Sequence, residues 1–335
     1  MTATLPSEVN AAQQLVQPAL REAVATLTPA MRRIASYHLG WTDEYGDAVD
    51  GDGGKALRPT LALLAARAVG APPESALPGA VAVELVHNFS LLHDDVMDGD
   101  TERRHRPTAW RLFGTPAAIL AGDALLTLAV EVLDSVGKRS ASRRLTAAVH
   151  RLIEGQSADI EYESRILVSV EECLHMEDGK TASLMACAAE LGALLGGADD
   201  RAVAALGDFG RNLGMGFQLV DDLLGILGSP ETTGKPVLAD LRVRKKSVPV
   251  VAALNSDTDS ASALREFYRR ERPPSDADVR TMAALIEDTG AITWTRDRAH
   301  RYIAAAESSL ATVNPPEDIH AALADLTRFV VERDR

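Results

Sequence analysis

Residues 87–108 read HNFSLLHDDVMDGDTERRHRPT, and this stretch decides the fold. Its apolar residues recur at helical spacing, which predicts a helix over 81–98 with Asp94 and Asp98 one turn apart on one face. The neighbours are apolar, so we expect the two carboxylates to point into a cleft, where a hard divalent cation would relieve the cost of burying them. Taken alone, the same pattern also suits a solvated acidic helix end.

A second acidic pair makes the metal site the better interpretation. Residues 217–225 read FQLVDDLLG, in which Asp221 and Asp222 lie inside an apolar helical run. Gln218 precedes Asp222 by one turn and shares its face. Acidic clusters on two helices far apart in sequence can face each other across a bundle core and share metal ions.

The rest of the chain has the pattern of a helical protein. Hydrophobic residues make up 46% of it and aromatic residues only 4%, while Ala and Leu are abundant, which favours helices over strands. The expected breaks between helices are 50–54, 71–73, 114–116, 196–197, 229–230, 273–274 and 315–316. No long linker divides the chain. We therefore predict a polar, disordered tail over residues 1–13 and one all-α domain over 14–335.

Composition and charge exclude several classes of protein. The net charge of −13 argues against a nucleic-acid binder and against a protein that binds an anionic membrane surface. The two cysteines, Cys173 and Cys187, cannot form a secreted disulfide framework. The long apolar run at 117–133 is broken by Asp123, and the N-terminus lacks the pattern of a signal peptide, so we expect no integral membrane segment. These features predict a cytoplasmic protein.

Basic residues accompany both acidic motifs. A single Lys or Arg is more often a surface charge, but together they supply the cations that a diphosphate needs. The candidates are Lys55 and Arg58 in GGKALRP (53–59), Arg103 and Arg104 after the first motif, the Lys180–Thr181 pair, and Lys235 and Lys245 in the loop after the second motif.

The combination of these motifs resembles a known family. The motifs are GGKALRP, residues 87–108, AGDALL (121–126), Lys180–Thr181, FQLVDD and GKPVLADLRVRKKSVP (234–249). In this order and spacing they resemble the trans-isoprenyl diphosphate synthases, or polyprenyl synthetases, and are nearest to the short-chain geranylgeranyl and farnesyl diphosphate synthases. The resemblance implies an orthogonal helical bundle around a deep central cavity, usually a homodimer. It also implies a prenyltransferase that joins isopentenyl diphosphate to an allylic diphosphate with Mg²⁺, about three ions per site.

The resemblance also implies a role for each candidate residue. The metal ligands would be Asp94 and Asp98, supported by Asp95, and Asp221, beside Asp222. Isopentenyl diphosphate would bind Lys55, Arg58, His87 and Arg104, and the allylic diphosphate would bind Arg103, Lys180, Thr181, Gln218, Lys235 and Lys245. The chemical step would depend chiefly on Asp94, Asp98, Lys180, Lys235 and Lys245. Two positions depart from the family pattern: Ala56 replaces a common arginine, and Gly225 replaces a common aspartate, from which we expect weaker metal binding.

Two residues before the first motif bear on product length. Phe89 occupies the position at which an aromatic residue forms the floor of short-chain relatives, although ordinary core packing explains it equally well. Ser90 is small and lies on roughly the same face as Asp94. The first motif lacks the two-residue insertion of bacterial farnesyl diphosphate synthases, so we expect a twenty-carbon product, geranylgeranyl diphosphate, before a fifteen-carbon one.

Three alternatives stay open at this point. A class I terpene cyclase shares the fold and the first motif, although it has no use for a second diphosphate site. A catalytically silent subunit of the same fold would explain Gly225. Finally, MRRIASYHLGW (31–41) resembles polyprenyl transferases associated with encapsulin shells, which suggests such a shell as a partner.

Overall fold

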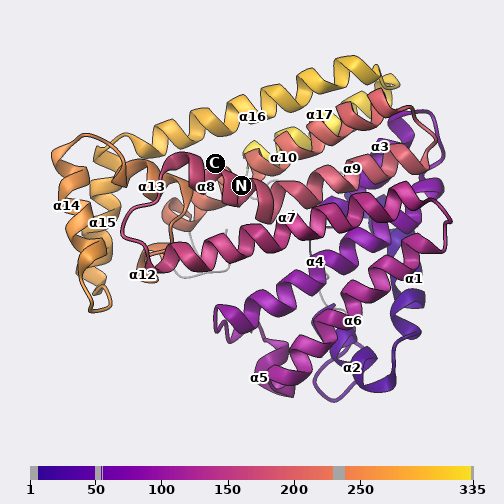
Figure 1. Ribbon diagram of the computed structural model, residues 1–335, viewed down its shortest axis with the longest axis horizontal. Coiled ribbons are helices and arrows are strands. Elements are labelled where there is room, and N and C mark those ends of the chain that lie inside the picture. Colours follow the sequence, from indigo (N-terminus) through magenta and orange to yellow (C-terminus); the bar gives the residue numbers. More distant parts are fainter. Residues whose placement is uncertain (1–6, 50–53, 55, 229–237, 333–335) are drawn as a thin grey trace.

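The computed structural model describes residues 7–49, 54, 56–228 and 238–332, and these are almost entirely helical (Figure 1). The first half contains α1 (Ser7–Ala25), α2 (Pro29–His38), α3 (Leu57–Ala68), the 3₁₀ turn η1 (Pro73–Ala76), α4 (Leu77–Met97), α5 (Ala109–Phe113), α6 (Thr115–Asp134) and α7 (Arg139–Ser164). The second half contains α8 (Val170–Glu177), the π-helical turn η2 (Asp178–Ala182), α9 (Ser183–Leu195), α10 (Asp200–Leu227), α12 (Ala239–Arg242), α13 (Val248–Leu254), α14 (Asp259–Arg269), α15 (Asp276–Asp288), α16 (Ala291–Val313) and α17 (Glu317–Glu332). The prediction of an all-α protein is confirmed.

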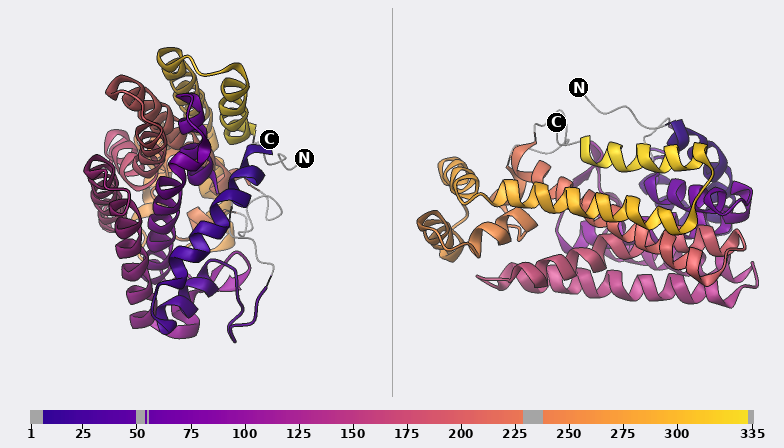
Figure 2. Two further views of the ribbon diagram at one scale, coloured as in Figure 1. Left: turned by 90° about the vertical axis from the view of Figure 1, so that its right-hand side faces the viewer. Right: turned by 90° about the horizontal axis from the view of Figure 1, so that it is seen from above.

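Helix α10 lies at the centre of the bundle. It packs against α9 on one side and against α16 and α17 on another, while α9 also packs against α3 and α7. In the right-hand view of Figure 2, α16 and α17 lie on the opposite side of the bundle from α7. The short helices α14 and α15 pack on each other at one end of the molecule (Figure 1). This arrangement brings the ends of α4, α7 and α10 into one region.

Small residues allow the central helices to approach closely. At Gly192 of α9, an added Cβ would stand 2.0 Å from the carbonyl oxygen of Ala62 on α3. Only glycine allows the two backbones to touch at this point. The abundance of Ala and Gly in the sequence therefore reflects tight helix packing.

The expected breaks fall between helices in the described residues. Gly114, with a φ of +88°, separates α5 from α6, and the prolines at 273–274 precede Ser275, which caps α15. The break at 229–230 and, apart from Gly54, the break at 50–54 lie outside the described residues. The tail prediction needs a correction, because α1 begins at Ser7 and buries Val9 and Ala12 in the core. Its apolar residues every three or four positions stabilise the helix through tertiary contacts.

A small hairpin follows α4, where the sequence indicated no strand. Strands β1 (Glu102–Arg103) and β2 (Arg106–Pro107) pair antiparallel. The two turn residues, Arg104 and His105, both have positive φ, 51° and 58°. Two-residue turns of this kind match the twist of the strands they join, even without glycine. The hairpin therefore fixes the arginine pair beside the first aspartate motif.

Two segments are long and apolar enough to cross a membrane by composition alone. They are Pro73–Met97, with 72% of its apolar window buried in the protein, and Thr115–Asp134, with 39% buried. Core helices of soluble proteins meet the same criterion, so the finding is weak evidence for a membrane. Ile119 and Leu120 of the second segment are exposed.

Candidate active site

The first aspartate motif lies at the C-terminal end of α4. Asp94 is in its last turn and Asp98 caps it, so the two residues are one turn apart, as the sequence predicts. Burial raises the pKa of the Asp94 carboxyl to about 6, Lys180 opposes this shift, and Asp98 adds to it. The pKa of Asp98 is also raised by partial burial, again against the charge of Lys180. The two carboxyls therefore repel each other, and the charge of Lys180 offsets part of this repulsion.

Asp95 points in a different direction from its neighbours. Its side chain is 1% exposed, and its Oδ1 accepts a hydrogen bond of 2.7 Å from Nε of Arg103 on β1. Successive residues of a helix are about 100° apart, so Asp95 lies well round from the face of Asp94. In this structure Asp95 anchors the hairpin to α4.

The two aspartates of the second motif also point in different directions. Asp222 is buried, and its two oxygens accept hydrogen bonds of 2.8 Å from Nε2 of Gln218 and from the backbone N–H of Val248. Burial raises the pKa of Asp222 to about 7, and Lys245 opposes the shift. Asp221 lies on the exposed side of α10. Asp222 thus fixes the start of α13 against α10, while Asp221 faces outward.

The Lys180–Thr181 pair lies on the π-helical turn η2. Lys180 Nζ is 2.5 Å from Oδ2 of Asp159 on α7, and Thr181 Oγ1 donates a hydrogen bond of 2.8 Å to Oε1 of Gln218. The turn lies directly on α7, because a Cβ at Gly155 would stand 2.4 Å from the backbone nitrogen of Lys180. Single π turns inside α-helices are frequent at functional sites. Here the turn directs two consecutive side chains to partners on two different helices.

Buried acids keep the two described lysines of the site charged. Burial disfavours the charge of Lys180, but Asp159 and Asp94 more than offset this effect and raise its pKa. Burial likewise disfavours the charge of Lys245, and Asp222, Glu177 and Asp240 raise its pKa above the ordinary value. Both side chains are therefore protonated point charges at neutral pH. Lys235 lies outside the described residues.

Arg58, His87 and Arg104 form a separate basic group. Burial and the neighbouring charges of Arg58 and Arg104 lower the pKa of His87 well below its ordinary range, so the imidazole is neutral. The buried Nε of Arg58 has no hydrogen-bond partner in the described part of the chain. A Cβ at Gly54 would stand 2.7 Å from Nη2 of Arg104, so the guanidinium packs directly on the glycine backbone. Lys55 lies outside the described residues.

Phe89 and Ser90 lie inside the bundle just before the first motif. Phe89 is 6% exposed, and its ring meets the ring of His93 edge-on with centroids 4.8 Å apart. Nε2 of His93 lies 2.9 Å from the carbonyl oxygen of Ile119 on α6. The hydroxyl of Ser90 donates a hydrogen bond of 2.8 Å to the carbonyl oxygen of His87. The ring of His93, which is itself hydrogen-bonded to α6, therefore packs against Phe89 and limits its movement.

Sequence reasoning missed three acids of the site: Asp159, Glu177 and Asp240. Asp159 and Glu177 stand in or beside helical runs with apolar faces, as the aspartates of both motifs do. A search for every acid in such a setting, rather than for pairs of acids, could have found them. Asp240 gave no comparable signal, because its partners are brought to it by packing.

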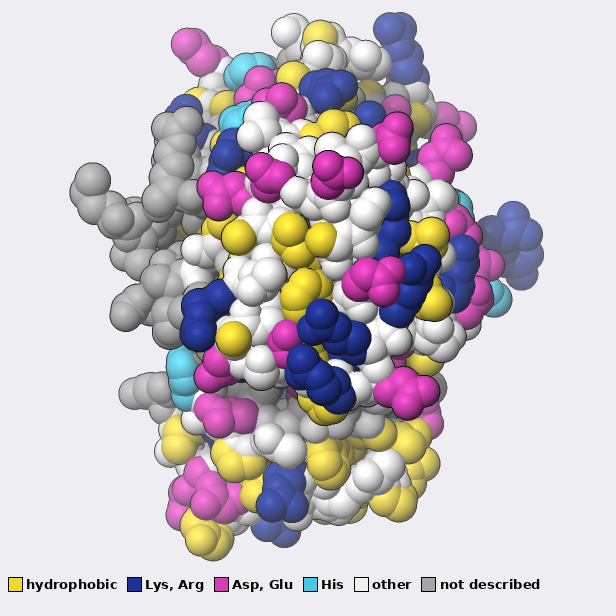
Figure 3. All heavy atoms as spheres, turned by 90° about the vertical axis from the view of Figure 1, so that its left-hand side faces the viewer, with side chains coloured by type: hydrophobic (Ala, Val, Ile, Leu, Met, Phe, Trp, Pro, Cys, Tyr) yellow, Lys and Arg dark blue, Asp and Glu magenta, His cyan; other side chains and the backbone are white. Residues whose placement is uncertain are grey.

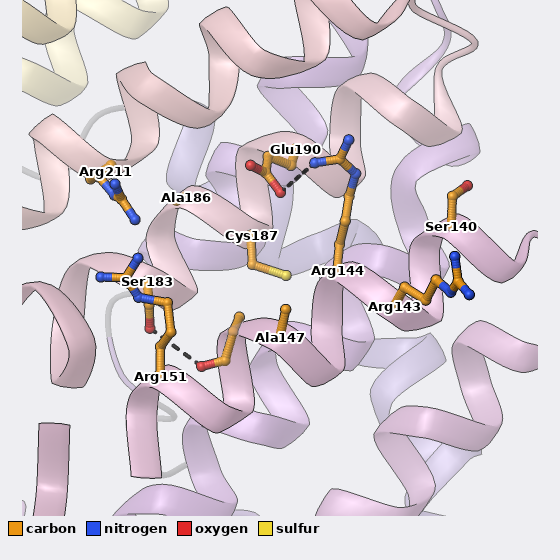
Figure 4. A pocket seen from close by; sticks show the side chains of 11 residues that line it. Ser140, Arg143, Arg144, Ala147, Arg151, Ser183, Ala186, Cys187, Glu190 and Arg211 are labelled. Atoms are coloured by element: carbon orange, nitrogen blue, oxygen red, sulfur yellow. Dashed lines mark hydrogen bonds and ion pairs between the residues drawn. The ribbon is translucent and has the colours of Figure 1, made fainter. Parts of the chain in front are cut away.

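A cavity of about 390 Å³ lies outside this site, between α7, α9 and α10 (Figure 4). Arginines line it, but most already have acidic partners: Nη1 of Arg144 is 2.9 Å from Oε2 of Glu190, and Arg151 and Arg211 both pair with Asp178. Asp178 is the first residue of η2. Arg151 and Arg211 therefore hold the π turn from its outer side.

Comparison with known proteins shows which family the chain belongs to. The family model for polyprenyl synthetases matches residues 40–286. A (2E,6E)-farnesyl diphosphate synthase of Mycobacterium tuberculosis is 48% identical over 98% of this chain and 93% of its own length. A geranylgeranyl diphosphate synthase of the same species is 45% identical over 82% of this chain and 79% of its own length.

Solved structures give the same result. A polyprenyl synthetase from Streptomyces coelicolor superposes with a TM-score of 0.94 at 49% identity, covering 98% of this chain and 100% of that one. A geranylgeranyl pyrophosphate synthase from Corynebacterium glutamicum, solved with isoprenyl diphosphate and magnesium, gives a TM-score of 0.81 at 28% identity, covering 98% and 99%. The chain has the all-α isoprenoid synthase fold and belongs to the polyprenyl synthetase family of trans-prenyltransferases.

Proposed function

We propose that this chain is a magnesium-dependent, chain-elongating prenyltransferase that condenses isopentenyl diphosphate with an allylic diphosphate to give geranylgeranyl diphosphate. The observation that carries the proposal is the presence of two separate basic groups. Lys180 and Lys245 lie among the acids of the two motifs. Arg58 and Arg104 instead lie close enough to His87 for their charges to lower its pKa, and Arg104 packs on Gly54. An enzyme with two diphosphate substrates needs two such groups.

The acidic residues suit Mg²⁺. Among the described residues, no three acidic, histidine or cysteine side chains form a ready metal cage. Mg²⁺ often takes only one or two protein carboxylates and completes its octahedron with water and substrate phosphates. The raised pKa values of Asp94 and Asp98 mark carboxyls whose charge the protein leaves poorly compensated. Asp94 and Asp98 at the C-terminal end of α4, with Asp221 on α10, would therefore hold the Mg²⁺, about three ions, which would act as a Lewis acid on the substrate diphosphate.

The protein groups then have distinct tasks in the reaction. Lys180 and Lys245 hold the allylic diphosphate as it leaves, and their buried acidic partners keep them protonated. When bound there, Mg²⁺ would neutralise part of the charge that develops on the leaving group. Thr181 and Gln218, linked by a hydrogen bond, border the same region. Prepositioned cations of this kind stabilise a leaving anion without reorganising during the reaction.

The second basic group orients the other substrate. Arg58 and Arg104 would bind the diphosphate of isopentenyl diphosphate, and neutral His87 would donate one N–H to it. When the allylic C–O bond breaks, its electron pair leaves on the diphosphate. The double bond of isopentenyl diphosphate then attacks the allylic carbon, and a proton passes to the released diphosphate. Holding both substrates in reacting geometry supplies much of the rate enhancement.

Product length would be set by Phe89. Its ring is braced by His93 and α6, so a growing chain cannot easily displace it. We propose a twenty-carbon product on the basis of this aromatic floor and the absence of an insertion in the first motif. Farnesyl diphosphate is the second candidate, favoured by the 48% identity to a farnesyl diphosphate synthase.

We also propose that the domain expected over 14–335, extended to Ser7 where α1 begins, acts as one catalytic domain in a cytoplasmic homodimer. Helix α6 is strongly apolar but only partly covered, and Ile119 and Leu120 on it are exposed, with Leu112 on α5 nearby. Hydrophobic side chains gather in the lower part of Figure 3, the region of α5 and α6. A second copy would cover this face. An encapsulin shell is a further proposed partner, and it rests on the resemblance of residues 31–41 to polyprenyl transferases associated with such shells.

Product analysis tests the proposed activity. The purified chain is incubated with labelled isopentenyl diphosphate, Mg²⁺ and dimethylallyl, geranyl or farnesyl diphosphate, and the products are sized by mass spectrometry. We expect labelled twenty-carbon diphosphate, lost on chelation of Mg²⁺. Asp94→Ala should lower turnover by about 10²–10³-fold, while Asp208→Ala, an exposed aspartate elsewhere on α10, should not.

The same experiment separates the alternatives. A hydrocarbon that contains no label would identify a terpene cyclase. A folded chain with no turnover on any allylic substrate would identify a silent subunit. Full turnover by Asp94→Ala would contradict the assigned site.

A further inference from the structure

Gly225 is in contact with a carboxylate from another helix. It stands on α10, one turn after Asp221, where the motif of the family often has another aspartate. A Cβ at this position would lie 2.2 Å from Oδ2 and 2.8 Å from Cγ of Asp240 on α12. Real Cβ atoms essentially never approach another heavy atom within 3.0 Å. Any side chain at residue 225 therefore requires Asp240 to move.

The backbone that carries Asp240 has little freedom to move. Helix α12 has four residues and lies between Leu238 and Arg244, both with positive φ, 61° and 53°. The carbonyl oxygen of Asp240 accepts a hydrogen bond of 2.9 Å from the backbone N–H of Lys245. Arg242 on the same turn pairs with Asp276 at 2.5 Å. Non-glycine residues keep positive φ only where the surrounding structure holds them there.

The charge of the Asp240 carboxyl acts on Asp222 of the second motif and on Lys245. Asp240 is one of three acids, with Asp222 and Glu177, that offset the burial of Lys245 and keep this lysine charged. It also acts on Asp222 directly, by adding to the shift of its pKa. A carboxylate therefore stands beside residue 225, although it is attached to α12 instead of α10.

We propose that Asp240 supplies from α12 the carboxylate that the second motif lacks at Gly225, and that it positions Lys245 toward the leaving diphosphate. On this proposal, glycine at position 225 leaves room for the carboxylate of Asp240, and its presence does not mean that a metal ligand has been lost. The role toward diphosphate rests on the function proposed above. The packing of Asp240 on Gly225 does not, so the two parts can be tested separately.

Thermal unfolding of the ligand-free protein tests the packing. Gly→Ala inside a helix normally stabilises a protein, because alanine loses less backbone entropy. We expect the opposite here: Gly225→Ala should lower Tm by roughly 2–5 °C. In an Asp240→Gly background the same substitution should leave Tm unchanged or raise it. An equal rise in both backgrounds would show that Asp240 does not occupy this space.

A carboxylate swap tests the role. Gly225→Asp and Asp240→Gly should each weaken binding of inorganic diphosphate with Mg²⁺, measured by calorimetry, by about tenfold or more. The double variant Gly225→Asp/Asp240→Gly should recover most of this loss, since it restores one carboxylate. If Gly225→Asp alone binds Mg²⁺ and diphosphate more tightly than wild type, Gly225 is a lost ligand and the proposal is wrong.

Asp240→Asn separates charge from shape. The amide has the size of the carboxyl, so Tm should change little, while binding of Mg²⁺ and diphosphate should weaken as in Asp240→Gly. Wild-type binding by Asp240→Asn would remove the positioning role. A wild-type chain that binds diphosphate but condenses no isopentenyl diphosphate would contradict the proposed function and leave the inference about Asp240 supported.

Discussion

Nζ of Lys180 lies 2.5 Å from Oδ2 of Asp159, and this ion pair joins η2 to α7 where the two backbones touch at Gly155. The two side chains are only 21% and 17% exposed. Charges in such a setting are poorly solvated, so each depends on its partner. The pair therefore fixes both the position and the charge of a lysine whose charge acts on Asp94 and Asp98 of the first aspartate motif.

Replacing the acid of this pair should impair the lysine. Asp159→Asn removes a charge that raises the pKa of Lys180 and leaves the ammonium without its nearest partner. We expect kcat to fall by about 10–100-fold with a smaller change in KM for isopentenyl diphosphate. Steady-state kinetics would measure both. A uniform rise in KM for both substrates would point instead to general unfolding of the site.

The pH dependence of stability follows from Asp94. Its pKa in the folded protein, about 6, lies above the ordinary value of 3.8, so the folded state binds this proton more tightly than the unfolded chain. The contribution is fully present below pH 4 and is lost as pH rises through 6, by about 2–3 kcal/mol. Urea unfolding of the ligand-free protein between pH 4.5 and 7.5 would measure this slope. Asp94→Asn should reduce this slope and leave the part due to Asp222, whose pKa is also raised, whereas Asp208→Asn, at an exposed position, should leave it unchanged.

Arg151 and Arg211, which form an arginine clamp on η2 outside the site, should affect the position of Lys180. Arg151 and Arg211 both pair with Asp178, the first residue of the π turn. Arg151→Gln should loosen the turn and lower kcat by about 3–10-fold. Arg143→Gln is the matched control, since Arg143 is an exposed residue that lines the same cavity. Equal activity of the two variants would mean that the clamp does not position the lysine.

The product-length assignment predicts an effect of residue size. Phe89→Ala should release products longer than twenty carbons, because only His93 and α6 would then stand behind the growing chain. Ser90→Phe should shorten the product toward fifteen carbons. Mass analysis of the products from farnesyl and geranyl diphosphate would detect both changes. If Phe89→Ala makes the same product as wild type, Phe89 is a packing residue only.

Most of the fold could be predicted from the sequence, because helix formation leaves a local signature. Apolar residues every three or four positions, and Gly or Pro between helices, depend on near neighbours alone. The turn spacing of Asp94 and Asp98 is local in the same sense. The limits of this reasoning appear at Ser7, where helix α1 begins inside the expected tail because its apolar face packs on the core.

The candidate site was predicted only in part, because the residue types do not show in which direction each side chain points from its helix. Asp95 and Asp222 stand in the same motifs as Asp94 and Asp221, yet Asp95 holds a hairpin arginine and Asp222 holds the start of α13. Which aspartate of a pair turns outward depends on the helix that packs beside it. The Asp-Asp sequence itself does not show which of the two side chains is exposed.

The sequence by itself determined the class of fold, the family and the two aspartate motifs, since these rest on periodicity and on the order of residues along one chain. Only the tertiary structure decided the partners: Asp159 for Lys180, Gly54 for Arg104 and Asp240 for Gly225. Each pair joins segments separated in the chain, and their contact depends on how closely the backbones approach. Close approach is a property of packed helices. At residue 225, where the family often has an aspartate, the absence of a side chain lets the carboxylate of Asp240 lie against α10.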